Sequence, residues 1–395
     1  MNEVSRGIDG LKGLDELTIA DLEALRLILH GDSVIDWRRL DFEDEDAVNA
    51  FLRSQELEPD SPQDRARMEH VKSESIAYLR RQFEYPIPRP VERATVPELL
   101  LIAGGRGHRA MCACAILKCM HIIHHLDGRE LLFVLPMSDQ EVFHIVEEKV
   151  YRVIGGMLAG GFPIIEFVGG RKNKDSLVTK LMSKQETIAA QIFDKLRFRV
   201  VTRSSDDILP VLHYLQRRLF PFNYVVPGQS VSSVFGFRSY LSHTPVAPLL
   251  DRLQPRSSGS GRGDEEDVRP QTENQFSANS YRIIHFVVDM PVRLPKRILD
   301  RAPAVARPLG NVIFVICEFQ IVDRDTEAHN EVGEASHAKY KDRQKRAVMR
   351  RLQLGAGHGE RVTPPPGAVT PSSGAPSTRP RTASAGASAE VRKKK

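Results

Sequence analysis

The spacing of apolar residues predicts a helical first part of the chain. Apolar side chains recur at helical intervals over 14–29 and 46–52, and residues 64–83 form a mostly charged stretch with helical character. The run Tyr85–Pro90 alternates proline with other residues, so it cannot continue a helix. We therefore expect residues 1–128 to form a mainly helical N-terminal region.

From residue 129 onward the pattern changes to alternating strands and helices. Ser138–Asp139 and Ser204 or Ser205 each precede a run with helical apolar spacing, and serine commonly caps a helix at this position. Short runs rich in apolar and β-branched residues predict strands at 131–135, 163–168, 196–202, 281–289 and 311–322. This order predicts an α+β domain with a mixed sheet over residues 129–350.

Two segments lack both patterns. Residues 254–277 are rich in serine, glycine and charge, which predicts a long surface loop inside the domain. Residues 351–395 are rich in proline, glycine, serine and alanine, so we expect a disordered basic tail. The terminal Arg392–Lys395 run suits contact with RNA or an anionic surface, although a solvated chain end is the favoured interpretation.

The composition is typical of a folded protein without membrane-spanning segments. Of the 395 residues, 41% are hydrophobic and 27% charged, and no apolar stretch approaches the ~18 residues of a transmembrane helix. Four cysteines are too few for a disulfide scaffold. Residues 355–395 carry seven basic and two acidic residues, which accounts for the whole net charge of +5. We expect a cytoplasmic protein whose folded body is electrically balanced.

A predicted helix over 110–125 concentrates cysteine and histidine and raises the question of a zinc site. The spacing does not match a paired-ligand zinc module, and the first two cysteines point to different sides of the helix. Small cysteines packed in a buried helix are the favoured interpretation, with zinc as the alternative. The side chains concerned are Cys112, Cys114, Cys119, His121, His124 and His125.

Basic residues gather between positions 171 and 203. This segment holds nine basic and three acidic residues, although the chain body is neutral overall. Arginine forks onto phosphate oxygens and lysine acts as a point charge, so the cluster is a candidate polyphosphate site. An ordinary solvated helix face is the alternative. The candidate residues are Arg171, Lys172, Lys180, Arg197 and Arg199.

Two acidic residues occupy positions at which a metal ion would be useful. Asp194 stands just before the strand predicted at 196–202, and Glu318 lies inside a very apolar strand. Burying a carboxylate there is costly unless it is paired or bound to a cation. Two carboxylates on neighbouring strands suit Mg²⁺ and phosphoryl-type transfer. The alternative is a buried ion pair of Glu318 with Arg197 or Arg199.

The start of the strand at 281–289 adds an aromatic residue to the basic site. Strand alternation places Tyr281 and His285 on one face, and it places Glu318 and Gln320 on one face of their own strand. A tyrosine at a strand start beside basic residues can stack on a nucleobase. A tyrosine packed in the core is the alternative.

The order of these segments resembles the synthetase domain of RelA/SpoT-type alarmone synthetases, the (p)ppGpp pyrophosphokinases. The resemblance covers about 160–345. It departs from the family pattern at Ser280, at Val322–Asp323 and at Val332, and Arg171 lies one residue closer to Ser176 than the pattern has it. The matching segments are Arg171/Lys172 with Ser176 and Lys180, Asp194–Val201, Asn279–His285, Glu318–Asp323 and Ser336–Lys341.

The resemblance implies a polymerase-β-like nucleotidyltransferase fold that moves pyrophosphate from ATP to the 3′-OH of GDP or GTP, the reaction of guanosine tetraphosphate synthesis. It implies that Asp194 and Glu318 hold Mg²⁺, with Glu318 also assisting deprotonation of the attacking hydroxyl. Tyr281 would stack on guanine. Further nucleotide contacts are implied for Arg171, Lys172, Lys180, Arg197, Arg199, Arg282, His285, Gln320, His337 and Lys341.

Two other functions are open from the sequence. The same fold can transfer pyrophosphate to another acceptor, such as an adenine nucleotide or tRNA. A non-catalytic nucleotide-binding protein is the second alternative, although a scaffold has no need of a carboxylate in the apolar strand around Glu318.

Overall fold

The computed structural model describes residues 10–36, 42, 44–183, 195–253, 280–333 and 336–356. Contacts divide the chain into one compact unit, Met1–Arg351, and a C-terminal unit, Leu352–Lys395. Within the second unit, only the last turn of a helix belongs to the described residues. The loop predicted over 254–277 and nearly all of the predicted tail lie outside them.

Helices make up the described chain up to residue 159. The helices expected over 46–52 and 64–83 are present and begin after the N-cap residues Asp44 and Ser61. The helix expected over 14–29 is divided into a 3₁₀ turn at Leu14–Glu16 and a helix that begins at Ile19. The elements are α1 (Ile19–His30), α2 (Glu45–Ser54), α3 (Pro62–Phe83), α4 (Arg89–Arg93), α5 (Val96–Ala103), α6 (His108–Val134) and α7 (Asp139–Ala159). None of the described helices is long and apolar enough to cross a membrane.

The strand predicted at 131–135 is wrong, because residues 131–134 form the last turn of α6 and Leu135 is the C-cap of that helix. Leu131 is fully buried and Leu135 is 5% exposed, and both belong to the main hydrophobic core. A short apolar run does not distinguish a strand from a buried helix segment. The stop signal is Pro136, which disfavours helical geometry at Leu135.

The described strands form one mixed five-stranded sheet in the order β1-β2-β5-β4-β3. The pair β2 and β5 is parallel, and the other neighbouring pairs are antiparallel. The predicted α+β class with a mixed sheet is thereby confirmed. The strands are β1 (Ile164–Arg171), β2 (Leu196–Thr202), β3 (Val231–Ser232), β4 (Ile284–Arg293) and β5 (Val312–Asp323).

The remaining helices connect these strands or follow them. Ser138 caps α7 with a reciprocal capping box, as its sequence predicts, and Ser204 does the same for the 3₁₀ turn before α9. The helices are α8 (Lys174–Ser183), α9 (Ile208–Arg218), α10 (Phe237–Leu241), α11 (Lys296–Leu299), α12 (Arg324–Asn330) and α13 (His337–Ala356).

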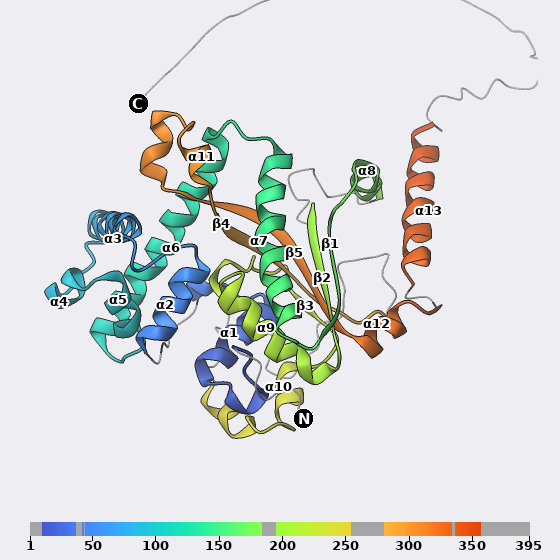
Figure 1. Cartoon of the computed structure of the whole chain (residues 1–395), viewed down its shortest axis with the longest axis horizontal. Coiled ribbons are helices and arrows are strands. Elements are labelled where there is room, and N and C mark those ends of the chain that lie inside the picture. Colours follow the sequence, from blue (N-terminus) through green and yellow to red (C-terminus); the bar gives the residue numbers. More distant parts are fainter. Residues whose placement is uncertain are drawn as a thin grey trace, which may run out of the picture. The chain divides into compact units, whose positions relative to one another are not determined.

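The two faces of the sheet differ in character. Helices α7 and α9 cover one face (Figure 1), where the fully buried rings of Phe198, Phe286 and Phe319 pack together. Strand alternation turns the residues between them to the opposite face. We call that opposite face the polar face, because it carries the charged side chains of β2 and β5.

Helix α6 contacts one end of the polar face and so connects the N-terminal helices to the sheet. His125 Nε2 lies 2.7 Å from Asp289 Oδ2 on β4, and the rings of His124 and His125 pack edge-on against Phe314 of β5. Gly128 marks the closest approach. A Cβ built there would lie 2.5 Å from the Phe314 ring, so only glycine fits without movement.

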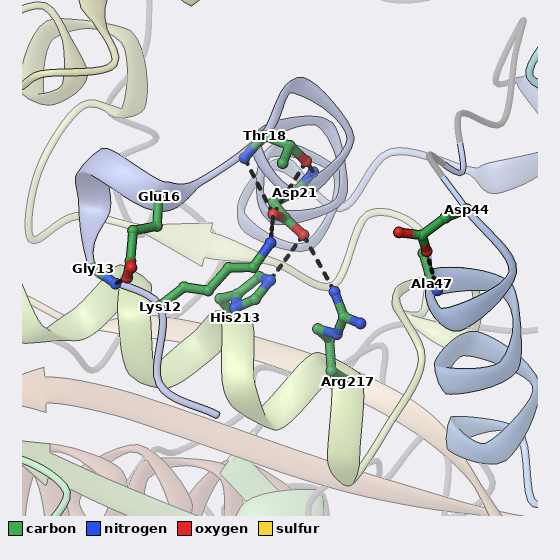
Figure 2. Close-up of polar contacts among 9 residues, drawn as sticks. All are labelled: Lys12, Gly13, Glu16, Thr18, Asp21, Asp44, Ala47, His213 and Arg217. Carbon is green, nitrogen blue, oxygen red and sulfur yellow. Dashed lines mark hydrogen bonds and ion pairs between the residues drawn. The ribbon is translucent and has the colours of Figure 1, made fainter. Parts of the chain in front are cut away.

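A buried carboxylate fastens α1 to α9. Asp21 accepts a hydrogen bond from Lys12 at 2.9 Å and lies 2.8 Å from His213 Nε2 and 4.0 Å from Arg217 (Figure 2). The pKa of Asp21 is well below its ordinary value, because the contacts with His213 and Lys12 outweigh the opposing effect of burial. The ionised carboxylate therefore stabilises the folded state.

Candidate functional site

The polar face brings five predicted site residues into one row. Arg197 of β2 is aligned with Glu318 of β5, and Arg199 is aligned with Gln320. On the other side of β5, His285 of β4 is also aligned with Gln320. Since side chains alternate along a strand, all five lie on the same face of the sheet.

Glu318 is the buried carboxylate of this row. Glu318 is only 6% exposed. Gln320 Nε2 donates to Glu318 Oε1 at 2.6 Å, and His285 Nε2 lies 3.5 Å from the same oxygen. Among the described residues, no lysine or arginine pairs with Glu318, and its Oε2 has no partner. The ion pair with Arg197 or Arg199 is therefore not found, and Oε2 is left for a cation or a hydroxyl.

The two arginines of β2 have different surroundings. Arg199 pairs with Glu327 of α12, while Arg197 has no hydrogen-bond or ion-pair partner within the described ranges. Burial raises the pKa of Glu327, and the charge of Arg199 opposes that rise. Gly170 of β1 is aligned with Arg197, and a Cβ built at Gly170 would meet no described atom within 4 Å. Among the described residues, nothing fills the space at Gly170 beside Arg197.

Tyr281 lies at the end of the row, just before β4, in a segment held by side-chain hydrogen bonds. Asn330 of α12 accepts from the Arg282 amide at 3.0 Å and donates to the Arg282 carbonyl at 2.6 Å. Ser233 holds both backbone groups of Ile283. The half-buried Tyr281 packs against Val201, Ile283 and Val322.

The electrostatic surroundings of Tyr281 place it with the row. Burial raises the pKa of its hydroxyl, and the next contributions come from Arg199, which lowers the pKa, and Glu327, which raises it. Smaller contributions come from Arg197 and Glu318. These interactions mean that the tyrosine lies within electrostatic range of both β2 arginines and of the buried carboxylate.

Arg171 is not brought to the polar face. It is aligned with the buried Leu196, and its Nε and Nη2 donate to both carboxylate oxygens of Glu147 on α7 at 2.9 and 2.7 Å. Its guanidinium also lies 5.6 Å from the centre of the Phe143 ring. The bidentate pair raises the pKa of Arg171 and occupies the donors that a phosphate would need.

The remaining predicted residues lie around the row or outside the described part. Lys172 follows β1 and Lys180 lies on α8, both half-buried. Arg282 and Lys341 are exposed, the latter on α13. Asp194 lies outside the described residues, as does the side chain of His337, so their predicted roles stay predictions.

The donor set on the polar face fits a magnesium ion that is held mainly by substrate. Among the described residues, no three His, Cys, Asp or Glu side chains gather to hold a metal ion. Mg²⁺ commonly uses only one or two protein carboxylates and takes its other oxygens from water and substrate phosphates. The free Oε2 of Glu318 suits that arrangement, and Asp194 is the predicted second ligand.

The cysteines and histidines of α6 take part in packing and hydrogen bonding. Cys112 and Cys114 are buried, and Cys112 Sγ lies 3.5 Å from His108 Nε2. Asn223 Nδ2 lies 3.1 Å from His121 Nδ1, within hydrogen-bond distance. In the ranges that the structure describes, these side chains form no metal-binding group.

Two residues of the site, Asn330 and Glu327, have no feature in the neighbouring sequence that identifies them as site residues. Asn330 holds the Tyr281 segment and Glu327 pairs with Arg199, yet both come from a short polar helix. A signal for that helix existed in Asp323, whose side chain accepts from the amides of Asp325 and Thr326. A helix predicted there would have placed Glu327 just beyond the end of β5.

Comparison with known proteins returned solved structures only. No family model matches the chain, and neither does any curated protein. Small alarmone synthetase 1 from Bacillus subtilis is 17% identical, and the alignment covers 54% of this chain and 88% of that chain with a TM-score of 0.27. The same enzyme bound to its product pppGpp is 17% identical, covering 56% and 91% with a TM-score of 0.28.

A third match has a different source. A GTP pyrophosphokinase family protein from Streptococcus pneumoniae is 16% identical, and the alignment covers 56% of this chain and 93% of that chain with a TM-score of 0.26. All three belong to the group of proteins that the sequence motifs resemble. Because these TM-scores are low, what this chain does has to be inferred from its own residues.

Proposed function

We propose that this chain is a Mg²⁺-dependent pyrophosphokinase that transfers pyrophosphate from ATP to the 3′-OH of GDP or GTP. The observation that carries the proposal is Glu318. It is a buried carboxylate with a free oxygen and no lysine or arginine partner among the described residues, and it lies in a row with two arginines beside a space that no described atom fills. A carboxylate kept in that state is costly unless a ligand compensates it.

The cations of β2 and of the segment after β1 hold the phosphates in this proposal. Arg197 faces the space beside Gly170 and has no partner among the described residues. Arg199 lies on the same face, two residues further along β2. Lys172 and Lys180 add charge from the edge of the sheet. Arg171 is left out, because Glu147 occupies its guanidinium.

Glu318 has two tasks in the reaction. With Asp194 it holds Mg²⁺, which neutralises charge on the phosphates when it is bound. Its Oε2 also accepts the proton of the attacking 3′-hydroxyl, whose oxygen bonds to the β-phosphorus of ATP as the bond from that phosphorus to the α-phosphate oxygen breaks and AMP leaves. Gln320 and His285 fix the carboxylate through Oε1. Little covalent participation is needed, since transfer of this kind depends on positioning and on neutralising charge.

Tyr281 forms the base-binding part of the site. Asn330 and Ser233 hold the backbone of the next two residues, Arg282 and Ile283, so the segment that carries the ring is ordered before the nucleotide arrives. Stacking of a base on a fixed aromatic ring is worth roughly 1–3 kcal/mol. The charges of Arg199 and Glu318 act on the Tyr281 hydroxyl, so in this proposal the guanine of the acceptor lies beside the residues that hold the phosphates of ATP.

The proposal is tested by following label from [γ-³²P]ATP. The purified chain is incubated with Mg²⁺ and, separately, with GDP, GTP, ADP, ATP or bulk tRNA, with EDTA as a control. We expect labelled guanosine tetraphosphate from GDP and pentaphosphate from GTP, and no product with EDTA. A labelled product formed on ADP, on ATP as acceptor or on tRNA, and not on GDP or GTP, would overturn the predicted acceptor. Nucleotide binding without any transfer would overturn the proposed activity.

A further inference from the structure

The short helix α12 joins the Tyr281 segment to strand β2. Asn330, its last residue, is 1% exposed and holds both backbone groups of Arg282, the residue after Tyr281. Glu327 lies about one turn earlier, and its Oε2 pairs with Nη2 of Arg199. Residues three apart share one face of a helix, so the face of α12 that holds the tyrosine segment also carries Glu327.

Glu327 keeps one carboxylate oxygen open. Its side chain is 21% exposed, and among the described residues nothing pairs with Oε1. That oxygen is not one of the buried unpartnered atoms of the described ranges, so it reaches the surface. In the ion pair with Arg199 the carboxylate is ionised and only accepts hydrogen bonds, and Oε2 still has a second lone pair to offer.

Packing and electrostatics place Glu327 near the Tyr281 ring. Tyr281 packs against Val201, which lies two residues after Arg199 on the same face of β2. Burial is the main reason for the raised pKa of the Tyr281 hydroxyl, and Glu327 raises it further with a larger effect than Glu318. A base that stacks on this ring therefore lies next to the open oxygen of Glu327.

The surroundings of Glu327 are acidic, in contrast with the arginines in the middle of the row. Burial raises the pKa of Glu327 most, Arg199 lowers it, and the charges of Glu331 and Glu166 raise it further. Glu166 of β1 is aligned with Val201 and so lies on the polar face as well. The row thus carries cations where phosphates are proposed to bind, and carboxylates at the end with the tyrosine.

Carboxylates beside a stacked base distinguish one base from the others. Guanine carries two adjacent donors, N1–H and the 2-amino group, on its Watson–Crick edge, and single bases are commonly identified by hydrogen bonds to that edge. Adenine has an acceptor, N1, beside its amino group, and that lone pair would face the carboxylate. Since an ionised carboxylate only accepts, this end of the row suits guanine and opposes adenine.

We propose that Glu327 selects the base of the acceptor nucleotide. Its Oε1 accepts from the 2-amino group of a guanine stacked on Tyr281, and its Oε2 accepts from N1–H while it stays paired with Arg199. The inference rests on the proposed function, which places the acceptor base at Tyr281. The motifs that carry the family resemblance do not include Glu327, so this assignment comes from the geometry of α12 alone.

The test is a change of base preference, measured by isothermal titration calorimetry of the full chain with Mg²⁺ and the diphosphates of guanosine, inosine and xanthosine. Inosine lacks the 2-amino group, and xanthosine carries an oxygen in its place. The wild-type chain should bind guanosine diphosphate about 10-fold or more tightly than the other two, because each of them loses a hydrogen bond to a charged group.

Glu327→Gln should reverse that preference. The single amide oxygen stays with Arg199, so the amide nitrogen faces the base and donates to the 2-oxygen of xanthine. We expect xanthosine diphosphate to become the tightest of the three ligands. Asp325→Asn on the same helix is the matched control, because its side chain is 90% exposed, and it should keep the wild-type preference.

The outcomes distinguish this role from a structural one. If Glu327→Gln weakens all three diphosphates by the same factor, Glu327 only positions Arg199 and the proposal is overturned. A wild-type chain that binds guanosine and inosine diphosphates equally, or binds neither, overturns it without any variant. Label transfer is measured separately. If the preference reverses but the wild-type chain transfers nothing, the proposed reaction fails and the role of Glu327 stands. If transfer to GDP occurs and the preference does not change, the role fails and the reaction stands.

Discussion

At the scale of single residues, Gly128 is the position at which one methyl group matters most. A Cβ there would meet the Phe314 ring at 2.5 Å and the Val312 carbonyl oxygen at 2.8 Å. Gly128→Ala should therefore lower the free energy of unfolding by roughly 1–3 kcal/mol, because α6 has to move away from β5. Urea unfolding measures the difference.

The matched control lies in a neighbouring helix. Gly155 of α7 has no atom within 4 Å of the built Cβ, so Gly155→Ala should raise stability by about 0.4–1 kcal/mol through the usual preference of alanine for helix. Equal effects of the two alanines would show that the close approach of α6 to β5 is wrong.

The arginines of the site provide a second contrast. Arg197 faces the open space on the polar face, whereas Arg171 is held by Glu147 on the other face. Arg197→Gln should raise the KM for ATP about 10-fold or more, the usual effect of losing a charge-assisted contact. Arg171→Gln should change it less than about twofold. Steady-state kinetics decide, and the reverse order would restore the phosphate role predicted for Arg171.

The sequence revealed those site residues whose chemistry conflicts with their surroundings. Glu318 is conspicuous because it interrupts an apolar strand, and alternation then places Gln320 beside it. The ion pair of Arg199 with Glu327 was not predictable, because the two residues are 128 positions apart and the sequence offers each of them many other residues of opposite charge. Arg171 was assigned by motif order, which says nothing about the face to which its side chain turns.

At the scale of elements, the contact of α1 with α9 depends on Asp21. The carboxylate serves Lys12, His213 and the amide of Thr18 at once (Figure 2). Asp21→Asn should lower the free energy of unfolding by roughly 2–4 kcal/mol, since it removes the charge from a buried group of ion pairs. Asp60→Asn, in an exposed pair with Arg53, should change it by less than about 1 kcal/mol. A small effect at Asp21 would contradict the buried role.

Helix α6 gives the fold a dependence on pH. Burial lowers the pKa of His124 to about 3 and that of His121 to about 4, from an ordinary value of 6.5. The unfolded chain then binds more protons, so the contribution is complete above pH 6.5 and is lost as the pH falls toward the folded values. The loss at pH 5 is roughly 2 kcal/mol per histidine. Asp21 adds nothing here, because its low pKa matters only below about pH 4.

This dependence is measured by urea unfolding at pH 7 and pH 5. His124→Leu should remove about half of the stability lost between the two pH values. An unchanged loss in that variant would mean that His124 is accessible to protons in the folded chain.

Elements with strong local signals were predictable, and those defined by distant contacts were not. The caps of α7 and of the turn before α9 follow from Ser138 and Ser204. Local spacing predicts a strand for the apolar run at 131–135, because its burial against the sheet core does not appear in that spacing.

At the scale of the whole folded unit, the arrangement joins two parts through one helix. Helix α6 lines a cavity of the N-terminal region and also contacts β4 and β5 at the polar face (Figure 1). The sequence predicted a helical region and a mixed sheet, but the contact of α6 with β4 joins residues 164 positions apart, and the pairing of β2 with β5 joins residues 121 positions apart. Those contacts lie beyond any local pattern.

The measurement that tests the central claim most directly is the rate of label transfer from ATP to GDP in Glu318→Gln. Glutamine keeps an oxygen that accepts from Gln320, so the fold should be unchanged. We expect the rate to fall about 10²–10⁴-fold, the usual effect of removing a general base. Glu148→Gln, in an exposed pair on α7, should keep the wild-type rate. A Glu318→Gln variant that is folded and retains transfer within about threefold would contradict the assignment of the site.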